Sequence, residues 1–348
     1  MMTNFKIGLS RALLSVMFLV ACSDVTSPEE ARKTGTTTPP PEAEPAPVPS
    51  PPVPVGPNPI AGATFWVSPD SKARDQANEW RASRPDDAAQ MDKIANNSQA
   101  RWFGDWSSNV ESSVNSFVGK VAATGAIPVL VAYNIPQRDC GGLSGGGGST
   151  ASAYRGWIAS FAKGLAGRNA IVVLEPDAVA NWDCLSSTDK ATRISLMQYA
   201  VQVLKAQGRT TVYLDGGNPR WHSANEQAAR LKAVNIAGAD GFALNVSNFF
   251  SSAENITYGS KVSALVDGKH FVIDTSRNGL GPSSDAQWCN PPGRALGTPA
   301  TTDTGHTLVD AFLWIKAPGE SDGACSGAPG AGEWWADYAL GLAQRSAL

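Results

Sequence analysis

Carboxylate, amide and basic side chains stand at the C-terminal ends of short apolar runs throughout this sequence. The groups are Tyr133 and Asn134 leading to Asp139, Glu175 and Asp177, Asp215, Asn245, Asp274 with Arg277, and Lys316 leading to Glu320 and Asp322. A single Asp or Asn after such a run is commonly the cap of the next helix. Because polar groups follow six of the seven runs, we interpret them as the rim of one pocket.

Several carboxylates on one rim are typical of glycoside hydrolysis. That reaction needs one carboxylic acid that stays protonated, and other carboxylates that activate water and stabilise a cationic transition state. A Ser/His/Asp hydrolase would place a histidine at a strand end, and none of the three histidines stands there. The histidines also lack ligand-like spacing and the cysteines contain no C-x-x-C pair, so we expect no metal site and no cofactor.

The apolar runs themselves indicate the fold. Near-continuous apolar character over four to seven residues is typical of parallel strands that are buried on both faces. Longer amphipathic stretches separate the runs, and the clearest predicts a helix over 188–207 with Ser187 or Thr188 as its cap. The pattern predicts an α/β fold, a distorted, TIM-barrel-like (β/α) barrel of about seven parallel strands with the site at their C-terminal ends. The predicted strands are 64–67, 127–133, 171–174, 211–214, 241–244, 270–273 and 312–315.

Composition excludes several function classes. Hydrophobic residues make up 42% of the 348 residues and charged residues 17%, so a large core is available and wholesale disorder is excluded. The net charge of -3 provides no basic surface for nucleic acid. No glycine-rich phosphate loop follows the first run, which disfavours a dinucleotide-binding fold. An open doubly wound sheet is the alternative to the barrel.

The first 59 residues read as a leader and a spacer. Lys6 and Arg11 precede an apolar run that ends at Leu19-Val20-Ala21-Cys22, which resembles the lipobox of bacterial lipoproteins. We expect residues 1–22 to be an export signal, Cys22 to be lipidated, and the protein to be anchored at the cell surface or in the periplasm. The alternative is an ordinary secretory signal with an incidental cysteine. Residues 23–59 are a proline-rich linker, and 60–348 form one catalytic domain, which we expect to be monomeric.

Six local strings together resemble the cellulases of glycoside hydrolase family six. The strings are YNIPQRDC at 133–140, LEPDAVAN at 174–181, YLDGG at 213–217, GFALNVSNF at 241–249, IDTSRNG at 273–279 and WIKAPGESDG at 314–323. They follow the family's order and cover about residue 61 to the end. The resemblance implies hydrolysis of β-1,4-glucosidic bonds with inversion at the anomeric carbon.

The resemblance also implies roles for the rim residues. Asp177 matches the general acid, and Asp139 and Asp215 are suited to hold its proton and raise its pKa. Asp139 matches the residue that receives the proton of the attacking water, through a hydroxyl such as Ser144. Asp322 matches a carboxylate near the reacting sugar, and either it or Asp139 is the base.

Further positions match the family's sugar contacts. Tyr133 matches the aromatic group that helps distort the reacting sugar, and Trp221 and Trp288 match stacking platforms, with Trp66 as a weaker candidate. Asn218 stands where many relatives have His, and it still bonds a sugar hydroxyl but carries no charge. The other expected cleft residues are Asn245, Arg277, Lys316 and Glu320. We assign Trp102, Trp106, Trp334 and Trp335 to packing or to the rim.

The family's cysteine order implies two disulfides, Cys140 with Cys184 and Cys289 with Cys325. The loop stretches 139–154 and 277–288 are short and rich in glycine, which favours an open cleft and internal cutting of a β-1,4-glucan. We therefore expect an endoglucanase. The alternatives are an exo-acting cellobiohydrolase of the same family and, from another class, a non-catalytic glycan-binding lipoprotein.

Overall fold

The computed structural model describes residues 56–348, and Cys22 with the expected signal lies outside these residues. Within the described part, no helix is both long enough and apolar enough to cross a membrane.

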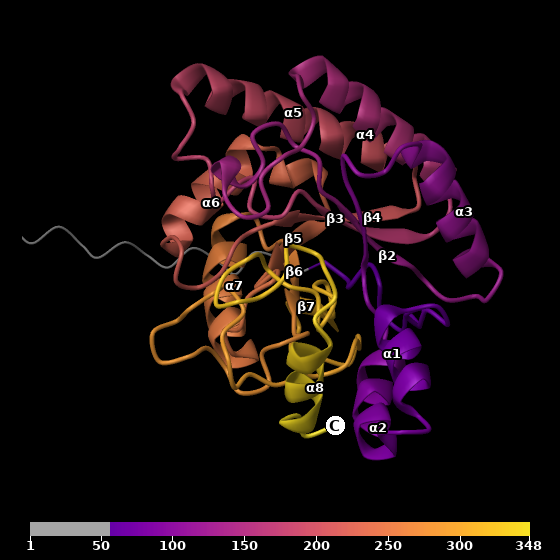
Figure 1. The fold of residues 1–348 in the computed structure, drawn as a ribbon. Helices are drawn as coiled ribbons and strands as arrows, with labels where there is room; N and C mark the ends of the chain where they lie inside the picture. Colours follow the sequence, from indigo (N-terminus) through magenta and orange to yellow (C-terminus); the bar gives the residue numbers. More distant parts are fainter. Residues whose placement is uncertain (1–55) are drawn as a thin grey trace, which may run out of the picture. The chain divides into compact units, whose positions relative to one another are not determined.

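Seven parallel strands form one curled sheet in which chain order and sheet order are the same (Figure 1). The sheet is open, because β1 and β7 do not pair within the described residues; the expected α/β fold is confirmed, but the barrel is a half-barrel. Two hydrogen bonds span the gap, from Ala100 N to Trp314 O and from Trp102 Nε1 to Ile315 O. The strands are β1 (Arg101–Phe103), β2 (Val129–Ala132), β3 (Ala170–Leu174), β4 (Thr210–Asp215), β5 (Gly241–Leu244), β6 (His270–Asp274) and β7 (Val309–Leu313).

The two ends of the sheet differ from the predicted strands. Residues 64–67 are not a strand of the sheet, because Phe65 forms only an isolated bridge with Ile127. The position beside β2 is taken by β1, which is three residues long and begins with Arg101, and so shows no apolar run. Strand β7 begins at Val309, three residues before the predicted run, because the buried Asp310 interrupts its apolar pattern.

Helices cover the outer side of the curled sheet, as Figure 1 shows for α3 to α7. Alternate strand residues face the helices, such as Leu130 and Val172, and the others face the interior, such as Val131 and Val173, so both faces are buried as expected. The predicted helix 188–207 is α5, and its cap is Ser186, whose side chain accepts from Asp189 N. The helices are α1 (Lys72–Trp80), α2 (Pro85–Ala95), α3 (Val110–Ala122), α4 (Ala151–Leu165), α5 (Ser187–Lys205), α6 (Ala224–Ala233), α7 (Ser252–Leu265) and α8 (Ala336–Gln344).

Candidate active site

The backbone at the C-terminal ends of the strands adopts conformations that side chains rarely take. Positive φ angles occur at Asp139 (52°), Glu175 (50°), Asp177 (68°) and Asn245 (68°). Each such residue costs about 1 to 3 kcal/mol and persists only where its surroundings hold it in place. Their concentration after β2, β3 and β5 marks this end of the sheet as the functional end.

Asp177 and Asp215 form the centre of the site. Asp215 Oδ2 accepts from Asp177 N at 2.9 Å and from Gly217 N at 3.2 Å, and its Oδ1 has no hydrogen-bond partner. Burial raises the pKa of Asp177 well above its usual range, and the negative charges of Asp215, Asp139 and Asp322 raise it further. Burial likewise raises the pKa of Asp215 to about 7. A carboxyl group that stays protonated near neutral pH can act as a general acid.

A hydroxyl relay leads from this centre to Asp139. Ser144 Oγ lies 3.1 Å from the Tyr133 hydroxyl and donates to Asp139 Oδ2 at 3.0 Å, while Ser144 N donates to the same oxygen. Burial and the charge of Asp177 raise the pKa of Tyr133, so Tyr133 stays neutral. A water near Tyr133 could therefore pass a proton through Ser144 to Asp139.

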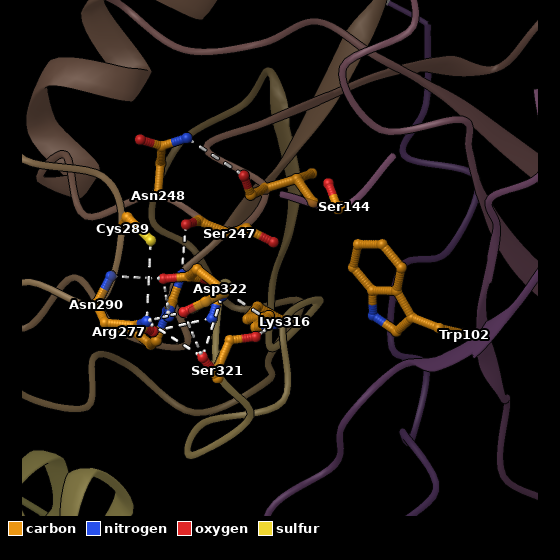
Figure 2. A network of polar contacts seen from close by, with 12 residues as sticks. Trp102, Ser144, Ser247, Asn248, Arg277, Cys289, Asn290, Lys316, Ser321 and Asp322 are labelled. Carbon is orange, nitrogen blue, oxygen red and sulfur yellow. Dashed lines mark hydrogen bonds and ion pairs between the residues drawn. The ribbon is translucent and has the colours of Figure 1, made fainter. Parts of the chain in front are cut away.

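Asp322 lies in a network of positive and polar groups (Figure 2). Its Oδ2 accepts from Arg277 Nη1 at 2.9 Å and from Asn290 N at 3.0 Å, and its Oδ1 lies 3.7 Å from Lys316 Nζ. Arg277 is fully buried and also donates to Ser247 O, so it holds Asp322 rather than lining the cleft. Burial lowers the pKa of Lys316, an effect that Asp322 opposes, and burial raises that of Glu320.

Besides Arg277, two further expected contact residues are placed differently. Asn245 is fully buried, and its amide is bonded to Phe250 N, Phe250 O and Asp274 O, so it holds loops together and has no free group for a sugar. Trp66 lies near the start of β2, at the other end of the sheet, where its ring packs edge-on against Phe117. The structure does not bring Trp66 to the site, because residues 64–67 do not form the first strand.

The tryptophans expected to bind sugar differ in exposure. Trp288 is 51% exposed, and Trp221 is partly buried and stacks on His222 at 6.2 Å. Asn218 is nearly buried, and its Oδ1 accepts from Arg220 N. The sequence assigned Trp102 to packing or to the rim but did not predict its contact with Tyr133, which its ring meets edge-on at 5.1 Å, beside the network in Figure 2. Trp102 is the middle residue of β1, a strand too short to be predicted, so no sequence pattern pointed to this contact.

Two disulfides hold the loops of the site, and both expected pairs are confirmed. Cys140 is joined to Cys184, and Cys289 to Cys325. The first links the loop after β2 to the segment after β3. The second links the segment after β6 to the one after β7, next to Asp322.

The loops after β2 and β7 touch across the site. A Cβ atom added at Gly323 would lie 2.7 Å from Leu143 Cβ, so Leu143 packs directly on the glycine backbone. Leu143 adjoins Ser144, and Gly323 adjoins Asp322. The contact therefore joins the two loops that carry Ser144 and Asp322, although Leu143 is still 47% exposed.

One group in the described part has the spacing of metal ligands, which the sequence did not suggest. Asp183, His222 and Glu226 present ligand atoms within 4.8 Å of one another. Arg230 Nη2 already bonds both carboxylates, at 2.7 Å to Asp183 and 2.6 Å to Glu226. We interpret the cluster as an ion-pair network rather than a metal site.

A family model described as glycosyl hydrolases family 6 matches residues 60–346. The chain belongs to glycosyl hydrolase family 6. Among curated relatives of this family 6 chain, endoglucanase A of Cellulomonas fimi is 44% identical over 294 residues. The match covers 83% of this chain but 62% of that protein, so the chain spans less than two thirds of its relative's length.

Solved structures of family 6 enzymes have the same fold. The endoglucanase Cel6 from Mycobacterium tuberculosis, solved in complex with methyl-cellobiosyl-4-deoxy-4-thio-β-D-cellobioside, matches with a TM-score of 0.79 at 46% identity. The match covers 82% of this chain and 98% of that one. Endoglucanase CEL6B from Humicola insolens matches with a TM-score of 0.74 at 28% identity, over 83% and 98% of the two chains.

Proposed function

We propose that this family 6 chain is an endo-acting β-1,4-glucanase that hydrolyses internal bonds of cellulose or related β-glucans. The observation that carries the proposal is the group of carboxylates around Asp177, in which Asp215 Oδ2 accepts from Asp177 N at 2.9 Å. Burial and the charges of Asp215, Asp139 and Asp322 raise the pKa of Asp177, as a general acid that must be protonated at working pH requires. Two family 6 endoglucanases at 44% and 46% identity support the endo assignment. We infer inversion at the anomeric carbon from membership of family 6.

The contacts support separate roles for the carboxylates. Asp177 protonates the leaving oxygen, and Asp215 holds the acid's backbone and raises the pKa of the acid through its charge. Asp139 takes the proton of the attacking water through Ser144, because its carboxylate ends the hydroxyl relay. Asp322, set between Arg277 and Lys316, supports the positive charge that develops on the reacting sugar.

We assign the sugar-binding side chains partly from how exposed they are. Trp288 and Trp221 are stacking platforms, since flat aromatic rings with an open face bind the apolar face of glucose. Trp102 is a further platform beside Tyr133. Lys316, Glu320 and Asn218 bind hydroxyl groups, while Arg277 and Asn245 act through their neighbours.

The decisive experiment follows viscosity and reducing ends together while the protein degrades carboxymethyl cellulose. Endo action predicts a steep fall in viscosity with few new ends, and equal activity when the chain ends of the substrate are blocked. The contact between Leu143 and Gly323 favours the second candidate, an exo-acting cellobiohydrolase. Exo action predicts slow viscosity loss, steady sugar release and no activity on blocked chains. No change in either signal would favour the glycan-binding lipoprotein.

We also propose that residues 1–22 direct export, that 23–59 are a spacer, and that 60–348 are the catalytic domain of a monomer. Cys22 would carry the lipid that anchors the protein to a membrane, with no other membrane contact. The lipobox-like string is the support. In a bacterial host, the wild type should partition into the detergent phase and Cys22→Ala should not. If wild type and Cys22→Ala partition equally, the protein is not anchored through Cys22 and is secreted or processed in another way.

A further inference from the structure

Glu175, two residues before the proposed acid, turns away from the cleft. Its side chain is fully buried and accepts hydrogen bonds from backbone groups of the neighbouring strand end. Asn134 N lies 3.0 Å from Oε1 and 2.9 Å from Oε2, and Ile135 N lies 2.9 Å from Oε2. One carboxylate thus connects the segment that carries Asp177 to the segment that leads to Asp139.

Arg193 of α5 joins the same two segments from the outer side. Its guanidinium is buried and donates to Pro136 O and Gln137 O, both at 2.8 Å. On the other segment it donates to Asn181 O at 3.2 Å. All of these acceptors are backbone carbonyls, so Arg193 fixes the course of the chain and not a side chain.

The surroundings of Glu175 are charged on several sides. Arg193 faces it from α5, the Tyr154 hydroxyl from α4, and Arg138 from the loop after β2. Burial raises the pKa of Glu175 to about 7, and the backbone donors oppose that rise. The positive φ at Glu175 and at Asp177 adds strain that these bonds must hold.

We propose that Glu175 is a positioning residue that sets the distance between Asp139 and Asp177 by binding the backbone of the loop after β2. This inference rests on the proposed function, in which Asp177 is the acid. The charge of Asp139 is one of the groups that keep Asp177 protonated. If the loop moves away, that contribution weakens, the pKa of Asp177 falls, and the acid is lost at lower pH.

The test compares Glu175→Gln with Asp310→Asn. Glutamine can keep its oxygen at the Oε2 position, which Asn134 N and Ile135 N share, but its NH2 group then stands at the Oε1 position and faces the donor Asn134 N at 3.0 Å. The link therefore loosens without loss of volume. Asp310 is a matched control, since it is equally buried but lies in the early part of β7, bonded to Tyr213 and His270. The readouts are kcat, KM, the pH profile of hydrolysis of a cellooligosaccharide, and the melting temperature.

For Glu175→Gln we expect kcat to fall roughly 10- to 100-fold with KM within about twofold, as for misplacement of reacting groups. The basic limb of the pH profile should move to lower pH, because that limb reflects loss of the proton from the general acid. Asp310→Asn should lower the melting temperature and leave the basic limb in place. A Glu175→Gln enzyme that is less stable but keeps the wild-type limb would overturn the proposal, as would one with unchanged kcat.

A second measurement does not depend on turnover. Carbon-13 NMR of aspartate-labelled protein, assigned with Asp177→Asn, gives the pKa of Asp177 directly. We expect that pKa to be lower in Glu175→Gln than in wild type, and an unchanged value refutes the positioning role. If wild type cleaves no β-glucan, the proposed function fails while this titration still decides the role of Glu175. Should Glu175→Gln not fold, Arg193→Lys weakens the same link and must shift the same pKa in the same direction.

Discussion

At the scale of single residues, Asp177 is the group on which turnover should depend most. The Asp177→Asn variant keeps the size and polarity of the side chain but has no proton to give to the leaving oxygen. Since general acid catalysis contributes about 10²- to 10⁴-fold, we expect kcat on cellooligosaccharides to fall by that order. Calorimetric affinity for the same oligosaccharides should stay near wild type. Normal cleavage by the variant would remove Asp177 from the role of acid.

A substrate with an activated leaving group provides the control for this variant. A dinitrophenolate leaves without protonation, so Asp177→Asn should retain far more activity on dinitrophenyl cellobioside than on cellooligosaccharides. Equal losses on both substrates would mean that the substitution disturbs binding or the attacking water instead. The two substrates therefore separate proton donation from the rest of the mechanism.

At the scale of elements, the contact between the loops after β2 and β7 should be sensitive to one methyl group. Gly323 has φ of 148° and lies against Leu143, so Gly323→Ala must displace one of the loops that carry Ser144 and Asp322. We expect kcat to fall and KM for cellooligosaccharides to rise, as measured by steady-state kinetics. Gly327→Ala is the control for a positive φ in the same loop, since its φ is 78° and nothing lies within 4 Å of an added Cβ.

These two glycine variants, together with a rescue variant at Leu143, separate the contact from backbone strain. If both lose activity to the same degree, strain in the loop explains the loss and the contact is unimportant. A Leu143→Gly change combined with Gly323→Ala should recover part of the activity, because it removes the Cβ that the alanine would meet. Failure of that rescue would contradict a direct contact.

The sequence predicted six of the seven strand positions because a parallel strand buried on both faces must be continuously apolar. It could not predict β1, since Arg101 and only three residues leave no run, and it placed a strand at 64–67 instead. The residue types at the strand ends also did not show whether each side chain points into the site or into the interior. Glu175 and Asn245 stand at strand ends like Asp177, but their side chains are buried and bind backbone groups. All three residues have a positive φ, so which way each side chain points depends on the course of the whole loop, which no sequence pattern revealed.

At the scale of the whole molecule, the buried carboxyls should make stability depend on pH. The usual pKa of Asp215 is 3.8, and burial raises it to about 7 in the folded protein. The folded state therefore binds the proton more tightly than the unfolded state does. The resulting stabilisation is complete below about pH 4 and is lost as pH rises through about 7.

Asp215→Asn should therefore melt at a higher temperature than wild type at pH 8, with the difference shrinking toward pH 4. Asparagine removes the charge but can keep both backbone bonds, because Asp177 N and Gly217 N donate to the same oxygen of Asp215. Differential scanning calorimetry across this pH range measures the effect. The control is Asp86→Asn, at an exposed position in the first turn of α2. Its melting temperature should not diverge from that of wild type as pH rises. Kinetics should show the opposite trend, because the same charge helps to keep Asp177 protonated and its removal costs activity at high pH. If the difference in melting temperature does not vary with pH, Asp215 does not titrate in this range. Another carboxyl of the site then has the raised pKa.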